Sequence, residues 1–475
     1  MPQAPDLTKK PFPWHAVRFA FRCVRWLLLL VVLAGAVRLV QWNRNDDPRF
    51  YHFLTTSPGR ALARAMNWPS FYNLPPEDKP ESEFTPEERD LKRSLESTLR
   101  DRWPSHRMVT RSGEEHLVRI LFESPQSITV QFSFGGQSRV TREISRNEIL
   151  SLDRYTAPIP RITWRDVRFQ MDFPAFQLLH HGPYTLLTDA PYFQVIETAR
   201  VLDHLYQQYM AIFGPLVQPR RSQQSLQVLF FSNEDDFSKA IARSAPEMAG
   251  SAGFYSPLED RMVVFNQYHS AFARQMRAEI EAELAKLIEN SRSAEERRSI
   301  ESTRFRVEEQ IRRRGKQETL ATLRHEAAHH LSYTYGVHSW FHAENGWLIE
   351  GLAVYFESDP PGETSFTHLN TLIQLRESNR IPSLAQLINI RKPSGFEAEL
   401  PELKSYETYA LSWVLFRYLM QESRRDDFFS YLRFIRDPAN LRELVSLPRE
   451  LLLARHMNTT PEALEKAWLE AVHTL

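Results

Sequence analysis

Two histidines and a glutamate stand at a spacing that could hold a metal ion and use it. His325 and His329 are four residues apart, and Glu326 directly follows the first of them. The surrounding segment predicts an amphipathic helix, because apolar residues recur every three or four positions: Leu320, Leu323, Ala327 and Leu331. On a helix, His325 and His329 lie one turn apart on the same side and can share one tetrahedral ion. Glu326 can then reach a water on that ion and take its proton.

A third ligand is needed, and its position separates the types of zinc hydrolase. The metzincin pattern requires Gly and His three and six residues after the second histidine, where this chain has Ser332 and Tyr335. Twenty residues separate His329 from Glu350, which lies in a second predicted helical run. A helix hairpin of this length can bring Glu350 back to the histidine pair. The fourth position is then left for water, as in catalytic rather than structural zinc sites.

These motifs resemble those of a known enzyme family. The segments HEAAHH and WLIEGLAVYFE, at this separation, are similar to the thermolysin-like gluzincins of the MA clan of zinc metallopeptidases. They resemble in particular a branch of predicted extracytoplasmic members with an E-G-x-A-x-Y signature. The resemblance implies one zinc ion per chain, bound by His325, His329 and Glu350, with Glu326 as the general base. It also points to Glu357 as a carboxylate that orients a ligand histidine.

The same likeness, which covers about residues 175–475, implies a donor for the oxyanion of the reaction. Gluzincins supply it from a downstream Tyr or His, and the helical segment that begins at Tyr406 resembles the one that carries this tyrosine. We favour Tyr409 over Tyr406 because it directly precedes the Ala-x-Ser-Trp pattern; the alternative is a tyrosine packed between helices. The strand expected at residues 262–266 would be the sheet edge on which an extended peptide adds.

Composition narrows the classes of chemistry. The 475-residue chain has 59 Lys and Arg against 59 Asp and Glu, so no global positive field exists and no nucleic-acid partner is expected. The one cysteine, Cys23, excludes internal disulfides, Cys-ligated zinc ribbons and iron–sulfur clusters. Neither the dinucleotide-binding fingerprint nor the P-loop occurs in the chain. The chemistry is therefore expected to rest on histidine and carboxylate side chains.

The N-terminal region predicts a membrane anchor. Residues 26–42 are apolar or small apart from Arg38 and Gln41, and five basic residues precede them: Lys9, Lys10, Arg18, Arg22 and Arg25. We interpret 26–42 as a single transmembrane signal anchor and 1–25 as a basic cytoplasmic tail. The rest of the chain would then be extracytoplasmic, or periplasmic in a bacterium. A cleaved signal peptide, a buried helix and an organellar presequence are the alternatives.

The remainder is expected to be α+β and to form three parts. Residues 43–104, rich in proline, predict a tether with one short helix near 87–100. Period-two patterns across 105–157, with Gly135-Gly136 as a hairpin turn, predict a small β-barrel of the SH3 kind. Residues 160–475 form the expected zincin-type peptidase domain, with a mixed sheet, an active-site helix hairpin and a C-terminal helical region. Within it, the charge-rich stretch 271–317 is interpreted as an inserted helical hairpin.

Together these features predict a membrane-anchored, extracytoplasmic zinc peptidase that hydrolyses a peptide or protein substrate. Two alternatives stay open. One is a non-catalytic binding or scaffold protein that keeps the zincin fold at the membrane. The other is a hydrolase of a non-peptide amide of the cell envelope. The sequence predicts neither the oligomeric state nor the substrate identity.

Overall fold

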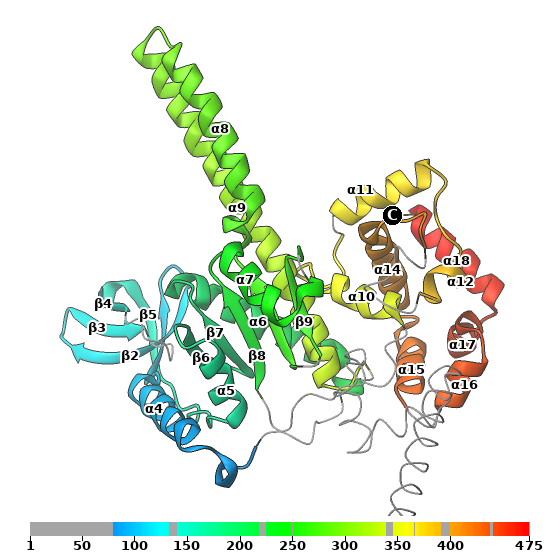
Figure 1. Ribbon diagram of the computed structural model, residues 1–475, viewed down its shortest axis with the longest axis horizontal. Helices are drawn as coiled ribbons and strands as arrows, with labels where there is room; N and C mark the ends of the chain where they lie inside the picture. Colours follow the sequence, from blue (N-terminus) through cyan, green and yellow to red (C-terminus); the bar gives the residue numbers. More distant parts are fainter. Residues whose placement is uncertain are drawn as a thin grey trace, which may run out of the picture.

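The computed structural model is a mixed α+β protein with two β-sheets and many helices (Figure 1), in agreement with the predicted class. It describes residues 79–132, 140–217, 225–248, 250–257, 259–338, 345–364, 366–390, 400–437 and 440–474. Within these ranges, five short 3-10 helices accompany the larger elements: η2 (Glu81–Glu83), η3 (Arg146–Glu148), η4 (Gly214–Leu216), η5 (Pro246–Met248) and η6 (Gln267–His269).

The first sheet lies where the sequence predicts the small β-barrel. Its strands are β1 (His106–Thr110), β2 (Glu115–Glu123), β3 (Ser127–Phe132), β4 (Val140–Ser145) and β5 (Ile149–Arg154). They pair antiparallel in the order β4-β3-β2-β1-β5, so the predicted run of short strands is present. The pairings of the described residues make an open sheet, and closure into a barrel stays a prediction. The expected turn at Gly135-Gly136 lies outside the described residues.

The short helix predicted near 87–100 is present, as α4 (Pro86–Arg102). Helix α4 begins at a capping box in which Thr85 and Glu88 satisfy each other's backbone N–H groups. It packs on α5 (Trp164–Asp172), and Leu99 joins the same apolar cluster as Phe169. Residues 79–104 therefore belong to the folded body, and residues 43–78 lie outside the described part.

The second sheet is mixed, as expected for the larger domain. Its strands are β6 (Gln177–His181), β7 (Tyr184–Thr188), β8 (Leu226–Phe231), β9 (Gly253–Ser256) and β10 (Arg261–Phe265), in the order β6-β7-β8-β10-β9. β7, β8 and β10 run parallel, whereas β6 and β9 are antiparallel to their neighbours. The prediction that residues 262–266 form the edge strand is wrong, because β10 lies between β8 and β9. The edge beside it is the four-residue strand β9.

Helices cover both faces of this sheet because its central strands are apolar on both sides. All six residues of β8 are buried, and alternate residues face two different cores. Val228 shares one core with Leu323, whereas Leu229 shares the other with Phe237. The first face carries α6 (Tyr192–Phe213) and α9 (Ala294–Thr334), and the second carries α5 and α7 (Glu234–Ser244).

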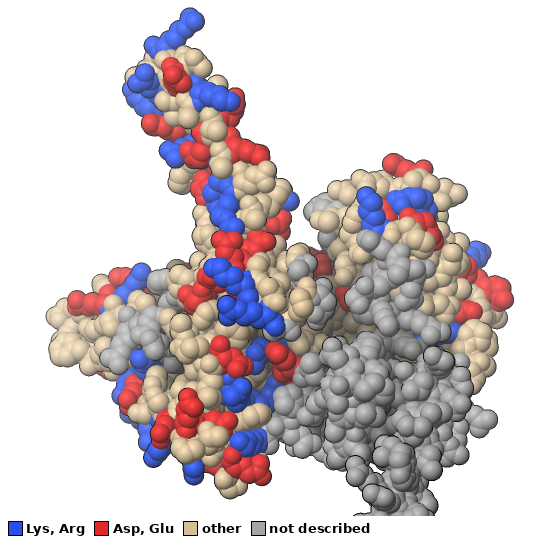
Figure 2. Space-filling view, in the orientation of Figure 1, with Lys and Arg blue, Asp and Glu red and all other residues tan. Residues whose placement is uncertain are grey.

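A two-helix arm projects far from the body (Figure 1). It consists of α8 (Ala271–Glu289) and the first half of α9, and charges of both signs cover the face shown in Figure 2. The predicted hairpin at 271–317 is thus helical. The second helix of the hairpin is not a separate element. It is the first part of α9, which runs without a break for 41 residues and includes His325. Where the arm leaves the body, Gly315 lies against the backbone of Tyr268, and an added Cβ would approach the Tyr268 Cα to 2.6 Å.

The chain after α9 is helical. Its helices are α10 (Gly346–Tyr355), α11 (Phe366–Glu377), α12 (Leu384–Ile388), α14 (Ser405–Leu419), α15 (Arg425–Arg436), α16 (Leu441–Ser446), α17 (Arg449–His456) and α18 (Pro461–Thr474). The expected C-terminal helical region is therefore present. The two helices α10 and α14 form its centre, and α11 and α18 pack on α14.

The predicted membrane placement is corrected by the structure. Among the residues that the structure describes, no helix is both long and apolar enough to cross a bilayer. The expected anchor at 26–42 and the tail 1–25 lie outside that part of the chain. The structure therefore gives no support to the single-pass anchor, the membrane partner or the extracytoplasmic location.

Candidate metal centre

The candidate site is built on the buried end of α9. Leu323, Ala327, Ala328 and Leu331 are fully buried, which fixes one face of the helix against the sheet and α6. The neighbouring face then presents His325 and His329, one turn apart, toward α10. The apolar stripe that predicts the helix thus also sets the direction in which its histidines point.

Helix α10 brings the third side chain. All residues from Gly346 to Val354 are buried, because α10 lies between α9 and α14. Gly351 allows this close approach: a Cβ at that position would meet the Ser412 carbonyl oxygen of α14 at 2.7 Å. The glycine next to Glu350 therefore lets α14 pack closely on α10.

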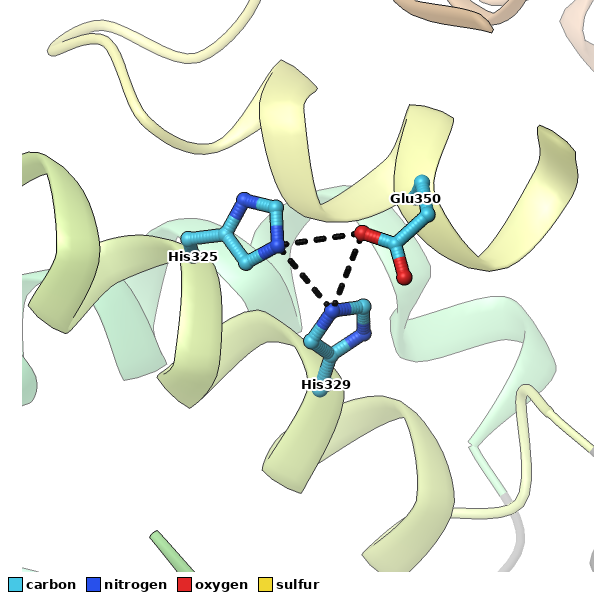
Figure 3. A group of neighbouring side chains, drawn as sticks. All are labelled: His325, His329 and Glu350. Atoms are coloured by element: carbon cyan, nitrogen blue, oxygen red, sulfur yellow. Dashed lines mark hydrogen bonds and ion pairs between the residues drawn. The ribbon is translucent and has the colours of Figure 1, made fainter. Parts of the chain in front are cut away.

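Three possible ligand atoms converge between the two helices (Figure 3). His325 Nε2 lies 3.1 Å from Glu350 Oε2 and 3.1 Å from His329 Nε2, and His329 Nε2 lies 3.5 Å from Glu350 Oε2. Zinc ligands at bond lengths of about 2.0–2.1 Å and tetrahedral angles lie about 3.3 Å apart. The three atoms therefore have the spacing of one face of a zinc tetrahedron, and they form a group able to hold a metal ion. Nothing in their arrangement identifies which metal that would be.

The outer nitrogen of His325 is hydrogen-bonded to a carboxylate. His325 Nδ1 lies 2.8 Å from Glu357 Oε1, directly after α10. When Nδ1 carries the proton and donates it there, the Nε2 lone pair is free to bind a metal. The sequence resemblance singles out Glu357 for this position, and the structure places it there. His368 Nε2 lies 3.2 Å from the other oxygen of Glu357, and sequence reasoning does not find this residue.

Burial and charge act together on these groups. Although burial opposes it, the charge of His329 and a hydrogen bond from His325 hold the pKa of Glu350 at about 2. Hydrogen bonds from His325 and His368 likewise outweigh burial and hold the pKa of Glu357 at about 2. Burial disfavours a charged His325 ring, yet its bonds to Glu350 and Glu357 raise the pKa of His325 well above the usual value. The site thus favours a positive charge at its centre.

Glu326 lies beside the three converging atoms but is not one of them. Burial raises the pKa of Glu326, and the nearby charges of His325 and His329 oppose that rise. The backbone N–H of Tyr255, on the edge strand β9, hydrogen-bonds the Glu326 carboxylate. A buried carboxylate with a raised pKa next to a metal-type group is suited to general-base chemistry.

Tyr409, on α14, is the tyrosine that reaches the site. Its ring centroid lies 6.1 Å from that of His325. The charge of Glu350, followed by burial and then the charge of Glu326, raises the pKa of Tyr409 far above its usual value. Its hydroxyl therefore stays protonated and can donate a hydrogen bond. Tyr406, the other candidate, is 48% exposed, with its ring beside Lys404.

Two polar clusters that sequence reasoning misses hold the site from outside. Buried Arg324 pairs with Asp359 (Nη2–Oδ2, 2.5 Å), which ties the residue before His325 to the loop after Glu357. On the other side, Asp260 accepts a 2.8 Å hydrogen bond from the Tyr255 hydroxyl. Asp260 also pairs with buried Arg165 (Oδ2–Nη1, 3.3 Å) on α5. These contacts connect residues of separate elements at no fixed spacing, so no local pattern reveals them.

His338 is a further buried histidine near the site. It is 95% buried, and its Nε2 has no hydrogen-bond partner among the described residues. Burial and then the charge of His329 lower the pKa of His338 to about 3, so this imidazole is neutral at physiological pH. His338 is not a member of the converging group of His325, His329 and Glu350.

Comparison with known proteins adds a partial match. Residues 319–440 match a family model described as "Protein of unknown function (DUF1570)". No curated protein matches the chain significantly. The matched segment contains His325, Glu326, His329, Glu350 and Tyr409. The site therefore lies within one recognisable unit of sequence, and the description of that unit names no activity.

Proposed function

We propose that this protein is a zinc-dependent hydrolase of peptide bonds. The observation that carries the proposal is the triangle of His325 Nε2, His329 Nε2 and Glu350 Oε2, with sides of 3.1, 3.1 and 3.5 Å. Three possible ligand atoms at this distance can be bridged by one cation, and two imidazoles with one carboxylate are a donor set that suits zinc. The likeness of HEAAHH and WLIEGLAVYFE to the thermolysin-like gluzincins supports a zincin-type fold and the same assignment.

The residues around the ion would carry the proton transfers. Bound zinc would act as a Lewis acid that polarises the scissile carbonyl and lowers the pKa of the attacking water. Glu326 would accept a proton from the attacking water and later deliver it to the leaving amine. Its raised pKa brings it nearer to the working pH, which favours both transfers. A hydrogen bond from the Tyr255 backbone amide would hold the Glu326 carboxylate during both transfers.

Tyr409 would stabilise the oxyanion that develops on the substrate carbonyl. Its hydroxyl keeps its proton because the neighbouring carboxylates raise its pKa. A donor that is already beside the site needs little reorganisation during the reaction, which makes such a hydrogen bond worth more than one in water.

Substitution of Glu326 tests this proposal. The full-length chain and its Glu326→Gln variant would be assayed for zinc by elemental analysis and for hydrolysis of a pool of quenched fluorescent peptides. We expect about one zinc per chain in both proteins and hydrolysis only in the wild type. Glu318→Gln is the matched control, because Glu318 lies on the same helix and pairs with Arg314 at the surface.

The other outcomes distinguish the alternatives. Zinc without peptide hydrolysis in the wild type would favour a non-catalytic binding protein or a hydrolase of a different amide. A wild-type protein that takes up no zinc at neutral pH would refute the metal site itself.

A further inference from the structure

Glu357 is shared by two histidines from different helices. Its Oε1 lies 2.8 Å from His325 Nδ1 on α9, and its Oε2 lies 3.2 Å from His368 Nε2 on α11. An ionised carboxylate only accepts hydrogen bonds, so each imidazole nitrogen that faces it must be the one that carries the proton. The two contacts therefore fix the tautomers of both rings.

The position of His368 is fixed independently of Glu357. Its ring packs on that of Trp413 of α14, with centroids 5.8 Å apart and planes 33° from parallel. Trp413 is almost completely buried and lies one helical turn after Tyr409. The His368 side chain itself is only 13% exposed. The His368 ring, held by Trp413, can therefore hold the Glu357 carboxylate in turn.

The Glu357 side chain needs such a partner. It follows the end of α10 and is 25% exposed, so the helix itself leaves its rotamer free. The Arg324–Asp359 pair fixes the backbone two residues further on, but it does not touch the carboxylate. A contact to each carboxylate oxygen is what sets the direction of the group.

We propose that His368 is a positioning residue of the metal centre: by donating from Nε2 to Glu357, it holds that carboxylate in the rotamer that orients the ring of His325. The inference deepens the proposed zinc site and rests on it. It extends the chain of contacts from the metal ligand through one carboxylate to a third helix. Groups in such outer positions commonly change metal affinity by about 10- to 100-fold when they are removed.

Zinc affinity of the full-length chain, measured by competition with a chelating indicator at one pH, tests the inference. We expect His368→Leu to raise the dissociation constant about 10-fold, and His368→Gln, which keeps an N–H donor, to restore most of the affinity. Glu357→Ala should raise it by about 10- to 100-fold. Adding His368→Leu to Glu357→Ala should change nothing further, because the effect passes through Glu357.

A matched control separates positioning from loss of structure. His456→Leu removes another partly buried histidine, which contacts Ser430 and Phe434 away from the site, and should leave zinc affinity unchanged. Wild-type affinity in His368→Leu, or effects of His368 and Glu357 that simply multiply in the double variant, would overturn the role of His368. Failure of His368→Gln to restore affinity would do so as well. A wild-type chain that binds no zinc would instead refute the metal site, which the wild-type titration reveals first.

Discussion

Replacing Gly351 by alanine tests the contact that brings α14 to the site. The added Cβ would meet the Ser412 carbonyl oxygen at 2.7 Å and the Phe416 Cβ at 3.1 Å, whereas ordinary contact begins at 3.4 Å. The nearest atom belongs to a helix backbone, so no side-chain rotation relieves the clash. The two helices must separate by about 0.7 Å, and overpacking of this kind costs about 1–3 kcal/mol. Tyr409 and Glu350 lie on the helices that move.

The control is Gly214→Ala, where nothing lies within 4 Å of the added Cβ and φ is −46°. Both substitutions reduce the entropy of the unfolded chain, by about 0.4–1 kcal/mol, so the difference between them isolates the clash. With about 2–4 °C per kcal/mol, Gly351→Ala should melt about 2–12 °C below Gly214→Ala. Thermal unfolding of the metal-free proteins, followed by tryptophan fluorescence, measures this. A Gly351→Ala protein that melts with or above the control would refute the close approach of α10 and α14.

Three further outcomes follow from the site. Tyr409→Phe should lower kcat for peptide hydrolysis by about 100-fold or more, as loss of an oxyanion donor does, without loss of zinc; unchanged kcat would exclude Tyr409 from the reaction. Zinc affinity should fall up to about tenfold per pH unit below the raised pKa of His325, because the ligand must lose its proton to bind; titrations at several pH values that give one affinity would contradict this. In the metal-free protein, Glu357 has its pKa lowered from 4.5 to about 2, so its stabilising effect is present above pH 4.5 and is lost as the pH falls toward 2. Glu357→Gln should therefore flatten the fall of the urea midpoint in that window, and an unaltered pH profile would show that the carboxylate contributes nothing.

The site could be read from the sequence where local spacing determines geometry. His325, Glu326 and His329 occupy one turn of one helix, so their arrangement follows from helical periodicity alone. Glu350 follows from the length of the connection between two helices. His368 could not be found in this way, because its contact with Glu357 depends on how α11 packs on Trp413.

The fold was harder to read where the environment of an element changes along its length. In the sequence, the charge-rich stretch 271–317 and the apolar stripe around Leu323 look like separate elements. In the structure, residues 294–317 and Leu323 belong to the same helix, α9. The composition changes because the helix passes from solvent into the core, not because it ends. The edge strand was missed for a related reason: β9 has only four residues, from Gly253 to Ser256, too few for an alternating pattern to stand out.

The unbroken α9 helix is also a mechanical lever. Gly315, which lies against Tyr268, would be the pivot of this lever. About 31 Å of helix separates it from Ala294, and about 15 Å separates it from His325. For a rigid helix, a sideways displacement of about 2 Å at the outer end would move the histidine by about 1 Å. Catalytic and metal-binding groups tolerate misplacement of only about 0.5 Å. A force on the tip of the arm would thus change the distance between the histidines and Glu350 if α9 moves as a rigid rod.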